Sequence, residues 1–349
     1  MNDQRCFRSI SAILLSVTVT PYCLAAALPR VIFLKKKDRI DILIDERRIT
    51  SYVIDPTLPK PALVPLCSPS GISLSRRYPL TELKGGSMDH THHLGLFFAV
   101  DRVNGTNFWN YYRNPDGREP KIKHIKILEI TPGPGRGVLA ALAHWIDKHG
   151  TFLLEEKKTM VFIAGEKKDE IALDITIDLT AQNEKVVFED IEEGLLGLRL
   201  SDYLRESKQS PSLRSGAPLP RESVSGTGRY FSSNGDEAAK QIWGKRARWV
   251  ALQGIRQDKV IGVAVLNHPA SLNYPTYWHV RDYGLFSANP LGQGDFQRQW
   301  PKPFRKNKPI PLHFTLPPGQ TVHFRFRLIL YEGIRTPDQI EQRFRTFAR

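Results

Sequence analysis

A strict alternation of apolar and polar residues is the feature that most constrains how this chain folds. In the stretch IALDITIDL, residues 171–179, every second residue is a large aliphatic one. Successive side chains of a β-strand point to opposite faces of a sheet, so this period of two predicts a strand with one buried face. Similar strands are predicted at 40–44, 122–130, 137–146, 152–163, 195–200, 247–254, 259–266 and 322–330. Many strands with Gly, Pro and Asn between them predict an all-β fold, a large antiparallel β-sandwich.

One helix is predicted near the C-terminus. The sequence TPDQ at 336–339 supplies an N-cap threonine, a proline at the first helical position and a capping-box glutamine. Ile340, Phe344 and Phe347 then share one helix face, and we expect this short helix to seal one end of the sandwich. The segment 205–241 has no periodicity, and we expect a mobile stretch or a functional flap there.

Residues 1–27 have the pattern of a signal peptide. Arg5 and Arg8 precede a short apolar run at 10–19, and alanines at 25–27 supply the small residues for cleavage. No later stretch approaches the ~20 apolar residues of a membrane span. We therefore expect an exported protein, periplasmic or secreted, with one domain over 28–349 and no membrane insertion after signal removal. An uncleaved N-terminal anchor is the alternative.

Cysteine content and charge limit the classes of partner. Cleavage would leave Cys67 alone, so no internal disulfide is expected and a buried thiol is. The formal charge is +14, but lysines and arginines are scattered and no ladder of basic and aromatic residues appears. We predict no nucleic-acid partner. The absence of a phosphate loop, a dinucleotide glycine pattern and paired CxxC motifs predicts no organic cofactor.

The first polar cluster is DHTHH, residues 89–93, which holds three histidines and a carboxylate. In an extended segment, His90 and His92 point to one side and His93 to the other, so one metal ion could bind all three only if the chain turns. Two histidines with Asp89 would suit Fe(II), Mn or Zn. The alternative is a polar sheet edge with one histidine facing a cleft. We predict a functional histidine and no metal.

The second polar cluster is YWHVRDY, residues 277–283. Alternation places Tyr277, His279, Arg281 and Tyr283 on one side. Aromatic, basic and imidazole groups on one wall are typical of a cleft that binds hydroxylated ligands, and a satisfied polar network at a sheet end is the alternative. A third cluster, EDIEEG at 189–194, could supply a general base.

These clusters, in this order, resemble an uncharacterised bacterial family labelled "methane oxygenase PmoA". The matching segments include DHTHHLGLFF, VNGTNFW, EEGLLGLRLSD and YPTYWHVRDYGLFSANPLG, and the resemblance runs from about residue 40 to 348. The membrane oxygenase in that label spans the membrane several times, so the label does not suit this chain. The resemblance implies an exported β-sandwich, related to the galactose-mutarotase type and to carbohydrate chemistry.

The resemblance also implies a set of site residues. We predict catalytic roles for His93, Glu193 and His279. The predicted substrate-binding residues are His90, His92, His268, Arg281 and Asp282, together with Tyr277, which the alternation within 277–283 places beside them. Two positions depart from the family pattern: Leu94 stands where an arginine is expected, and Asn267 where aspartate is commoner before His268-Pro269. Both departures bear on whether this copy keeps the full activity.

Three functions are compatible with these residues. The first is an exported carbohydrate-active enzyme that acts on a sugar or oligosaccharide by His/Glu acid–base chemistry. The second is a non-catalytic carbohydrate-binding accessory protein with the same cleft. The third is a metal-dependent oxygenase or hydrolase that uses Asp89, His90 and His93.

Overall fold

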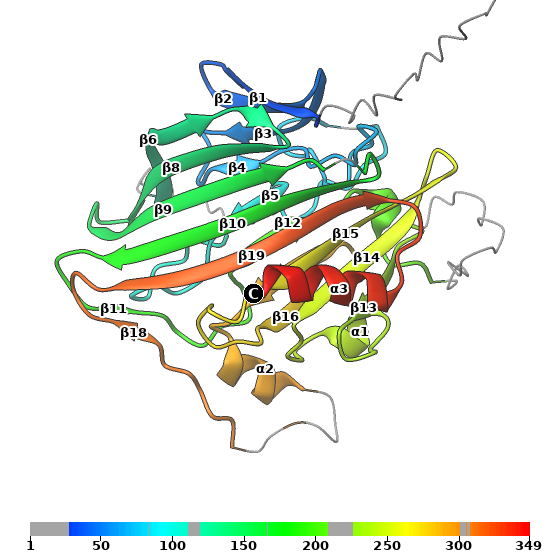
Figure 1. Ribbon diagram of the computed structural model, residues 1–349. Helices are drawn as coiled ribbons and strands as arrows, with labels where there is room; N and C mark the ends of the chain where they lie inside the picture. Colours follow the sequence, from blue (N-terminus) through cyan, green and yellow to red (C-terminus); the bar gives the residue numbers. More distant parts are fainter. Residues whose placement is uncertain are drawn as a thin grey trace, which may run out of the picture.

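Two large antiparallel sheets pack face to face in the computed structural model of this chain (Figure 1). The structure describes residues 28–82, 84–110, 119–165, 167–208, 226–300, 305 and 308–349, so the predicted signal peptide, 1–27, lies outside the described residues. In spatial order, the nine-stranded sheet contains β16 (Tyr277–Val280), β17 (Leu285–Asn289), β12 (Leu196–Arg199), β5 (Leu96–Phe98), β4 (Ala62–Leu63), β3 (Arg47–Val53), β2 (Arg39–Ile44), β1 (Arg30–Lys35) and β7 (Gly133–Pro134).

The second large sheet has eight strands. In spatial order they are β13 (Arg229–Ser232), β14 (Trp249–Arg256), β15 (Lys259–Asn267), β19 (Thr321–Glu332), β10 (Glu170–Ala181), β9 (Phe152–Ile163), β8 (Arg136–Ile146) and β6 (Lys121–Thr131). A small pair joins β11 (Val186–Val187) to β18 (Thr315–Leu316). The predicted all-β antiparallel sandwich is confirmed, and the alternation at 171–179 lies within β10.

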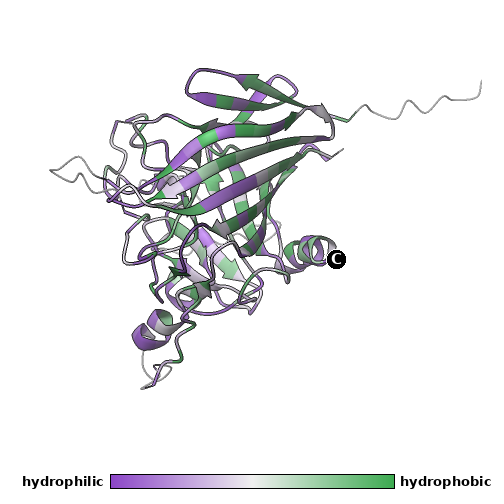
Figure 2. Ribbon diagram, turned by 90° about the vertical axis from the view of Figure 1, so that its left-hand side faces the viewer, coloured by the Kyte–Doolittle hydropathy of each residue, from purple (hydrophilic) through white to green (hydrophobic). Residues whose placement is uncertain are grey.

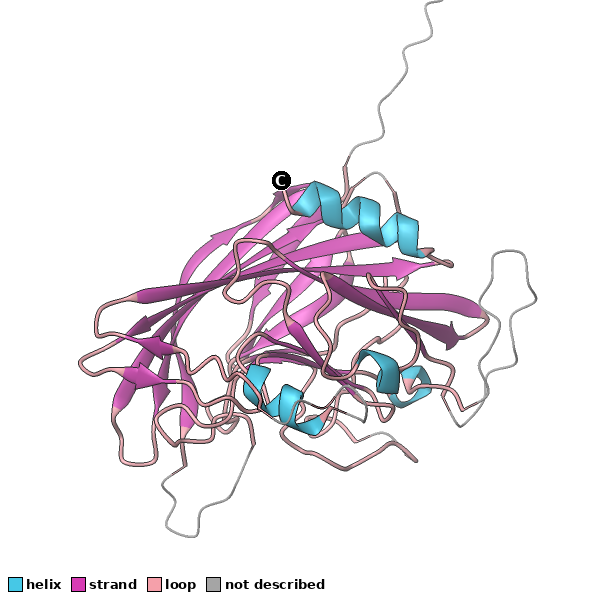
Figure 3. Ribbon diagram, turned by 90° about the horizontal axis from the view of Figure 1, so that it is seen from below, coloured by secondary structure: helices cyan, strands magenta, loops and turns pink. Residues whose placement is uncertain are grey.

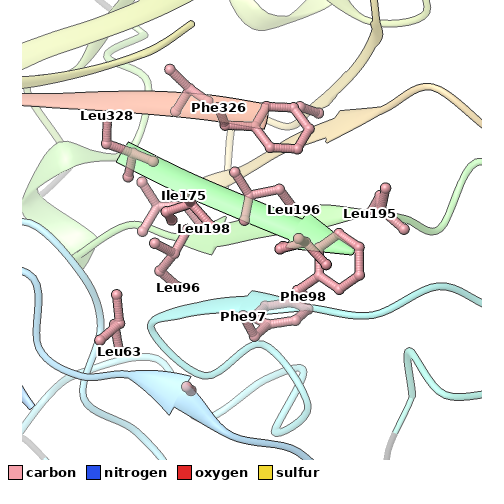
Figure 4. Close-up of a cluster of buried hydrophobic side chains, with 14 of the residues drawn as sticks. Leu63, Leu96, Phe97, Phe98, Ile175, Leu195, Leu196, Leu198, Phe326 and Leu328 are labelled. Carbon is pink, nitrogen blue, oxygen red and sulfur yellow. The ribbon is translucent and has the colours of Figure 1, made fainter. Parts of the chain in front are cut away.

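The core lies between the two sheets. Side chains of β5 and β12 face those of β10 and β19 there, including Leu96, Phe98, Leu196, Ile175 and Phe326 (Figure 4). Apolar and polar residues alternate along the strands (Figure 2), as a sheet with one buried face requires. Each fully buried Leu or Phe stabilises the fold by roughly 1.5–3 kcal/mol relative to exposure.

The C-terminal helix α3 (Pro337–Phe347) has the predicted capping box, in which Thr336 and Gln339 bond each other's main-chain N–H groups. Its expected place was wrong. Instead of sealing an end of the sandwich, α3 lies across the outer face of the eight-stranded sheet, where Ile340 and Phe344 pack in a cluster with Trp249 (Figure 3). An apolar patch on that face needs a cover, and the apolar stripe of α3 supplies it.

The outer face of the nine-stranded sheet lies on the opposite side of the molecule and carries the short helices α1 (Ala239–Ile242) and α2 (Gln293–Gln299) (Figure 3). The segment 205–241, expected to lack regular structure, contributes β13 and part of α1; residues 209–225 lie outside the described residues. A 3-10 helix, η1, covers Asp202–Leu204. Cys67 is a buried free thiol, as predicted. Among the described helices, none has the length and apolar character needed to cross a membrane.

Candidate functional site

Strand register places the predicted polar residues on the outer face of the nine-stranded sheet. Phe97 pairs with Gly197, Gly197 with Ser287, and Ser287 with His279. Residues paired across neighbouring strands point to the same face, so this row crosses β5, β12, β17 and β16 on one side. Three strand spacings of ~4.8 Å put the Cα atoms of Phe97 and His279 about 14 Å apart. The neighbouring row, Phe98 to Trp278, faces the core instead.

The histidine segment forms a turn, so the expectation that its imidazoles point to opposite faces was wrong. His90 has a positive φ of 44°, and the His93 N–H donates to the His90 carbonyl at 2.9 Å. Arg76 holds this turn, because its guanidinium donates to the main-chain oxygens of Asp89, His90 and His93 at 2.8, 2.8 and 3.2 Å. A guanidinium that is distant in the sequence therefore stabilises this turn.

The turn gathers the three imidazoles beside one another. The rings of Tyr283, His90, His93 and Phe97 form a column of near-parallel neighbours, with centroids 5.0, 5.1 and 6.0 Å apart. The ring of His92 lies 4.2 Å from that of His93. Burial lowers the pKa of His92 to about 3 and lowers the pKa of His93 far below its usual range. Both imidazoles are therefore neutral at pH 7.

His93 is packed more like a core residue than like a general acid. Its side chain is 2% exposed, and neither ring nitrogen has a hydrogen-bond partner among the described residues. No hydrogen bond, ion pair or ring contact between described residues joins His93 to Glu193 or His279. Among the described residues, the three predicted catalytic residues therefore do not form one contact group.

Asp89 bridges two buried arginines. Its Oδ1 accepts from Arg76 at 2.8 Å and from Arg199 at 2.7 Å, and its Oδ2 lies 3.0 Å from His90 Nδ1. Burial alone would raise the pKa of the Asp89 carboxyl, but Arg199 and His90 lower it to about 2. Arg199 is fully buried, and its guanidinium lies 4.7 Å from the ring centroid of Tyr283.

Glu192, Arg281 and His279 form a contact group at β16. Arg281 Nη2 donates to Glu192 Oε1 at 3.1 Å, and Arg281 Nε donates to His279 Nε2 at 3.0 Å. Because a guanidinium can only donate, His279 Nε2 accepts, so Nδ1 carries the proton and donates to the Glu192 carbonyl at 3.0 Å. Burial and, to a smaller extent, the charge of Arg281 lower the pKa of His279 to about 3. His279 is a neutral positioning group for the Glu192 loop and Arg281.

The Glu192 carboxyl is poised between its two protonation states at neutral pH. Its pKa is raised to about 7: burial raises it most, Arg281 opposes this, and the neighbouring Glu193 and Asp295 act in the same direction as burial. Oε2 is buried and has no hydrogen-bond partner among the described residues. The prediction from sequence named Glu193 as the base. Burial raises its pKa too, but Glu192 holds the contacts with Arg281.

Several side chains fix the loop that carries Glu192. Asn289 Nδ2 donates to the carbonyls of Ile191 and Glu192, each at 2.9 Å, and the Glu192 N–H donates to Asp295 at 3.0 Å. Asp190 accepts from the main-chain N–H groups of Gly294, Leu312 and His313. Two carboxylates of the acidic run 189–194 therefore have different contacts. Asp190 anchors the loop through main-chain N–H groups, and Glu192 binds Arg281.

Tyr283 connects the two polar groups. Its ring stacks on His90, and its pKa, raised first by burial, is also affected by Arg281, Arg199 and Glu192. The histidine turn therefore contacts the segment that carries Arg281, two residues before Tyr283 in the chain.

Lys60 is a site residue that the sequence reasoning missed. Its side chain is buried, and Nζ donates to the carbonyl of Trp109 at 2.5 Å while lying 4.8 Å from the ring centroid of Phe97. Burial lowers the pKa of Lys60 to about 7. A cavity of about 490 Å³ opens beside it, lined by Thr57, Leu58, Pro59, Lys60, Pro79, Thr91, His92 and Leu94. The only sequence feature that could have indicated a buried Lys60 is its place between two prolines beside an apolar run.

Three predicted binding residues lie elsewhere. His268 follows β15 and contacts Phe347 of α3, with ring centroids 5.0 Å apart, so it belongs to the outer face of the eight-stranded sheet. Tyr277 shares the face of His279 but is buried under α2, stacked on Phe296 at 5.4 Å. Asp282 is exposed, its main-chain carbonyl accepts from the Glu206 N–H at 3.0 Å, and burial and, to a smaller extent, its charge raise the pKa of the Glu206 carboxyl.

Leu94 and Asn267, the two residues that depart from the family pattern, lie in different parts of the fold. Leu94 is buried and lines the cavity beside Lys60, so its identity changes that cavity. Asn267 is buried at the end of β15, where its Oδ1 accepts from the Thr276 N–H at 3.0 Å, away from the histidine turn.

In the part of the chain that the structure describes, no group of three or more His, Cys, Asp or Glu side chains is arranged to hold a metal ion. Asp89, the carboxylate of the metal hypothesis, is already engaged by Arg76 and Arg199. Although the turn brings three imidazoles together, they and Asp89 are not arranged to bind a metal ion.

Comparisons with solved structures found proteins described in terms of aldose epimerases. A candidate aldose 1-epimerase from Escherichia coli K12 is 12% identical, with 87% of this chain and 99% of that chain covered and a TM-score of 0.33. An aldose epimerase homologue from C. elegans is 8% identical, with coverages of 88% and 99% and a TM-score of 0.33. A galactose mutarotase related enzyme from Lactobacillus acidophilus is 8% identical, with coverages of 88% and 100% and a TM-score of 0.32.

The description of the fold rests on the order and register of the strands and not on these similarities. No activity of this chain follows from them. A comparison with curated proteins gave no significant match. A family profile matches residues 39–345, most of the chain, and it includes the histidine turn, the Glu192 loop and the strands β16 and β17. The chain therefore belongs to DUF6807, a family of unknown function.

Proposed function

We propose that this protein is an exported carbohydrate-active enzyme that acts on a sugar or glycoside by proton transfer at Glu192. The observation that carries the proposal is a buried carboxyl with a pKa of about 7, bonded to Arg281 through one oxygen and unpartnered, among the described residues, at the other. A general acid or base works best when its pKa is near the working pH. Sugar hydroxyls are the groups that such a carboxyl and an arginine bind together.

The surrounding residues have defined roles in this proposal. The ionised Glu192 accepts a proton from the sugar, and a protonated neighbour returns one; Glu193, whose pKa is also raised by burial, suits that second role. Arg281 binds Glu192 and keeps its ionised form accessible. His279 positions Arg281 and the Glu192 carbonyl. The predicted catalytic roles of His93, Glu193 and His279 stay predictions.

The test compares turnover with binding. Purified wild-type protein is mixed with a panel of free aldoses and aryl glycosides, and anomer exchange and product formation are followed by proton NMR. Glu192→Gln should reduce turnover by roughly 10²–10⁴-fold, the usual contribution of an acid–base group, with ligand affinity changed by less than about tenfold. The control is Glu341→Gln, which removes another arginine-paired carboxylate, on α3.

Two outcomes would overturn the enzyme proposal. If wild-type protein binds sugars without converting any of them, it is a carbohydrate-binding accessory protein. If it converts a sugar and Glu192→Gln keeps full turnover, the assigned carboxyl is wrong. The proposed chemistry is proton transfer and includes no oxygenase step.

Export is the second part of the proposal and rests on the pattern of residues 1–27. Expression of the full chain in a bacterium, followed by cell fractionation and N-terminal sequencing, tests it. Processing near Ala27 and recovery outside the cytoplasm are expected. An unprocessed chain that stays in the cytoplasm would contradict export.

A further inference from the structure

The cavity beside the histidine turn has the size and wall composition of a small-molecule site. Its volume of about 490 Å³ lies within the ~300–1,000 Å³ typical of such sites. Leu58, Pro59, Pro79 and Leu94 make most of the wall apolar. Its nitrogen-bearing side chains are Lys60 and His92. Among the described residues, no carboxylate lines the cavity.

The charges around the cavity are unbalanced. Two buried guanidinium groups, of Arg76 and Arg199, and the buried amine of Lys60 act on the His92 imidazole, and each of them disfavours its protonation. With a pKa of about 7, Lys60 carries its positive charge in part of the molecules at neutral pH. Asp89 is shared between the two arginines. Buried charge of one sign is costly unless an opposite charge approaches it.

A second carboxylate nearby does not restore the balance. Asp202 accepts from the Ser87 N–H and hydroxyl, each at 2.7 Å, and pairs with Arg205 at 2.9 Å. Its charge is therefore already matched by an arginine of its own. The excess positive charge on the cavity side remains.

The histidine turn also contains an unsatisfied buried donor. A neutral imidazole carries one N–H, yet neither nitrogen of His93 has a partner among the described residues, although its side chain is 98% buried. Its ring lies 4.2 Å from the ring of His92, which lines the cavity. A buried polar group without a partner is uncommon in folded proteins and calls for an explanation, such as a bound ligand or water.

We propose that this cavity binds the anionic group of an acidic saccharide, a carboxylate, sulfate or phosphate carried on a sugar ring, through Lys60 and His92. The anion would offset the excess positive charge, while Leu58 and Leu94 contact the apolar face of the ring. The inference rests on the proposed function in taking the ligand to be a saccharide. The His92 ring contacts the edge of the His90 ring, which stacks on Tyr283, so ring contacts lead from this cavity to the segment that carries Arg281.

Calorimetric titration with matched pairs of sugars tests the inference. The probes are D-glucuronate, glucose 6-sulfate and glucose 6-phosphate against D-glucose, and D-galacturonate against D-galactose, at low salt and at about 0.3 M salt. We expect at least one anionic sugar to bind wild-type protein tenfold or more tighter than its neutral parent. Salt should weaken that preference, because screening reduces electrostatic attraction. The preferred anion identifies the substrate class.

Three variants locate the effect. His92→Asn and Lys60→Met should each lose the preference for the anionic sugar. Lys259→Met removes a lysine that does not line the cavity, pairs with Glu332, and should keep the preference. Because Lys60 bonds the Trp109 carbonyl, thermal unfolding checks that Lys60→Met is folded, and His92→Asn serves alone if it is not.

Equal affinities for anionic and neutral sugars in wild-type protein would overturn the inference, and so would a preference that survives in both cavity variants. Failure of the proposed function is separate. Neutral sugars converted by Glu192 without any anionic preference would overturn the cavity inference alone. An anionic sugar that binds through Lys60 and His92 but is not converted would overturn the enzyme proposal alone.

Discussion

Arg281 and Glu192 form an ion pair in which the carboxyl nevertheless keeps a raised pKa. The Nη2 and Oε1 atoms are 3.1 Å apart, a distance at which an exposed pair would lower the pKa of the carboxyl. Burial outweighs the arginine, and the charges of Glu193 and Asp295 act in the same direction as burial. The result is a carboxyl that gains and loses a proton near pH 7.

Replacement of Arg281 by methionine should raise the pKa of Glu192 above 7, because the opposing positive charge is lost while burial remains. The pH dependence of the ¹³C-carboxyl NMR shift of Glu192 measures this. Arg248→Met removes an arginine paired with Glu341 and should leave Glu192 unchanged. A pKa of Glu192 that falls or stays constant in Arg281→Met would contradict the described balance.

His279 should make the fold sensitive to acid. Its folded pKa of about 3 lies below the ordinary 6.5, so the unfolded chain binds the proton more readily. The contribution of His279 is therefore fully present above pH 6.5 and is lost as the pH falls from 6.5 towards 3. The loss approaches roughly 1.4 kcal/mol per pH unit.

Urea unfolding at pH 4 to 7 measures this loss. His279→Gln keeps a donor and an acceptor but cannot titrate, so its free energy of unfolding should fall less steeply with acid than that of wild-type protein. His149→Gln, at an exposed position, provides the control and should follow the wild-type curve. Parallel curves for wild type and His279→Gln would show that His279 titrates as in the unfolded chain.

Gly197 permits the close packing of aromatic rings over the sheet. A Cβ atom at this position would lie 2.6 Å from Phe97 and 2.8 Å from Trp109. Gly197→Ala should therefore lower the free energy of unfolding by about 1–3 kcal/mol, the usual cost of overpacking. Gly165→Ala, where a Cβ meets nothing within 4 Å, is the matched control. Equal stability of the two variants in urea unfolding would rule out the clash.

Thr336 should contribute to stability through its cap. Thr336→Ala removes the acceptor for the Gln339 N–H, and the free energy of unfolding should fall by about 1 kcal/mol. Thr346→Ala changes an exposed threonine in the last turn and should alter stability by less than about 0.5 kcal/mol. Calorimetric unfolding of both variants decides this; an equal loss in the two would argue against the cap.

Much of the fold could be predicted because burial on one face imposes a period of two. The stretch 171–179 and its counterpart at 322–330 alternate because β10 and β19 lie side by side in one sheet, and each buries one face in the core. The same reasoning placed Tyr277, His279 and Arg281 on one side. Helix α2 was missed because it has seven residues and no side-chain N-cap.

The histidine turn could not be predicted from its own residues. Alternation holds only where a strand forms, and here Arg76, at least thirteen residues away in sequence, gathers three carbonyls and bends the chain. Lys60 escaped for a similar reason. Its burial depends on the carbonyls of Phe108 and Trp109, which are 48 and 49 residues further along. Contacts between distant segments carry no local signal.

The position of β19 has a consequence for the order of events during synthesis. The last strand along the chain, Thr321–Glu332, lies between β15 and β10 in the eight-stranded sheet. Until that segment leaves the ribosome, β15 and β10 have unpaired edges, and the sheet exists at most as two separate halves. A nascent chain of this protein therefore cannot complete its eight-stranded sheet before residues 321–332 have been made, and β10 and β15 keep one exposed edge each until then.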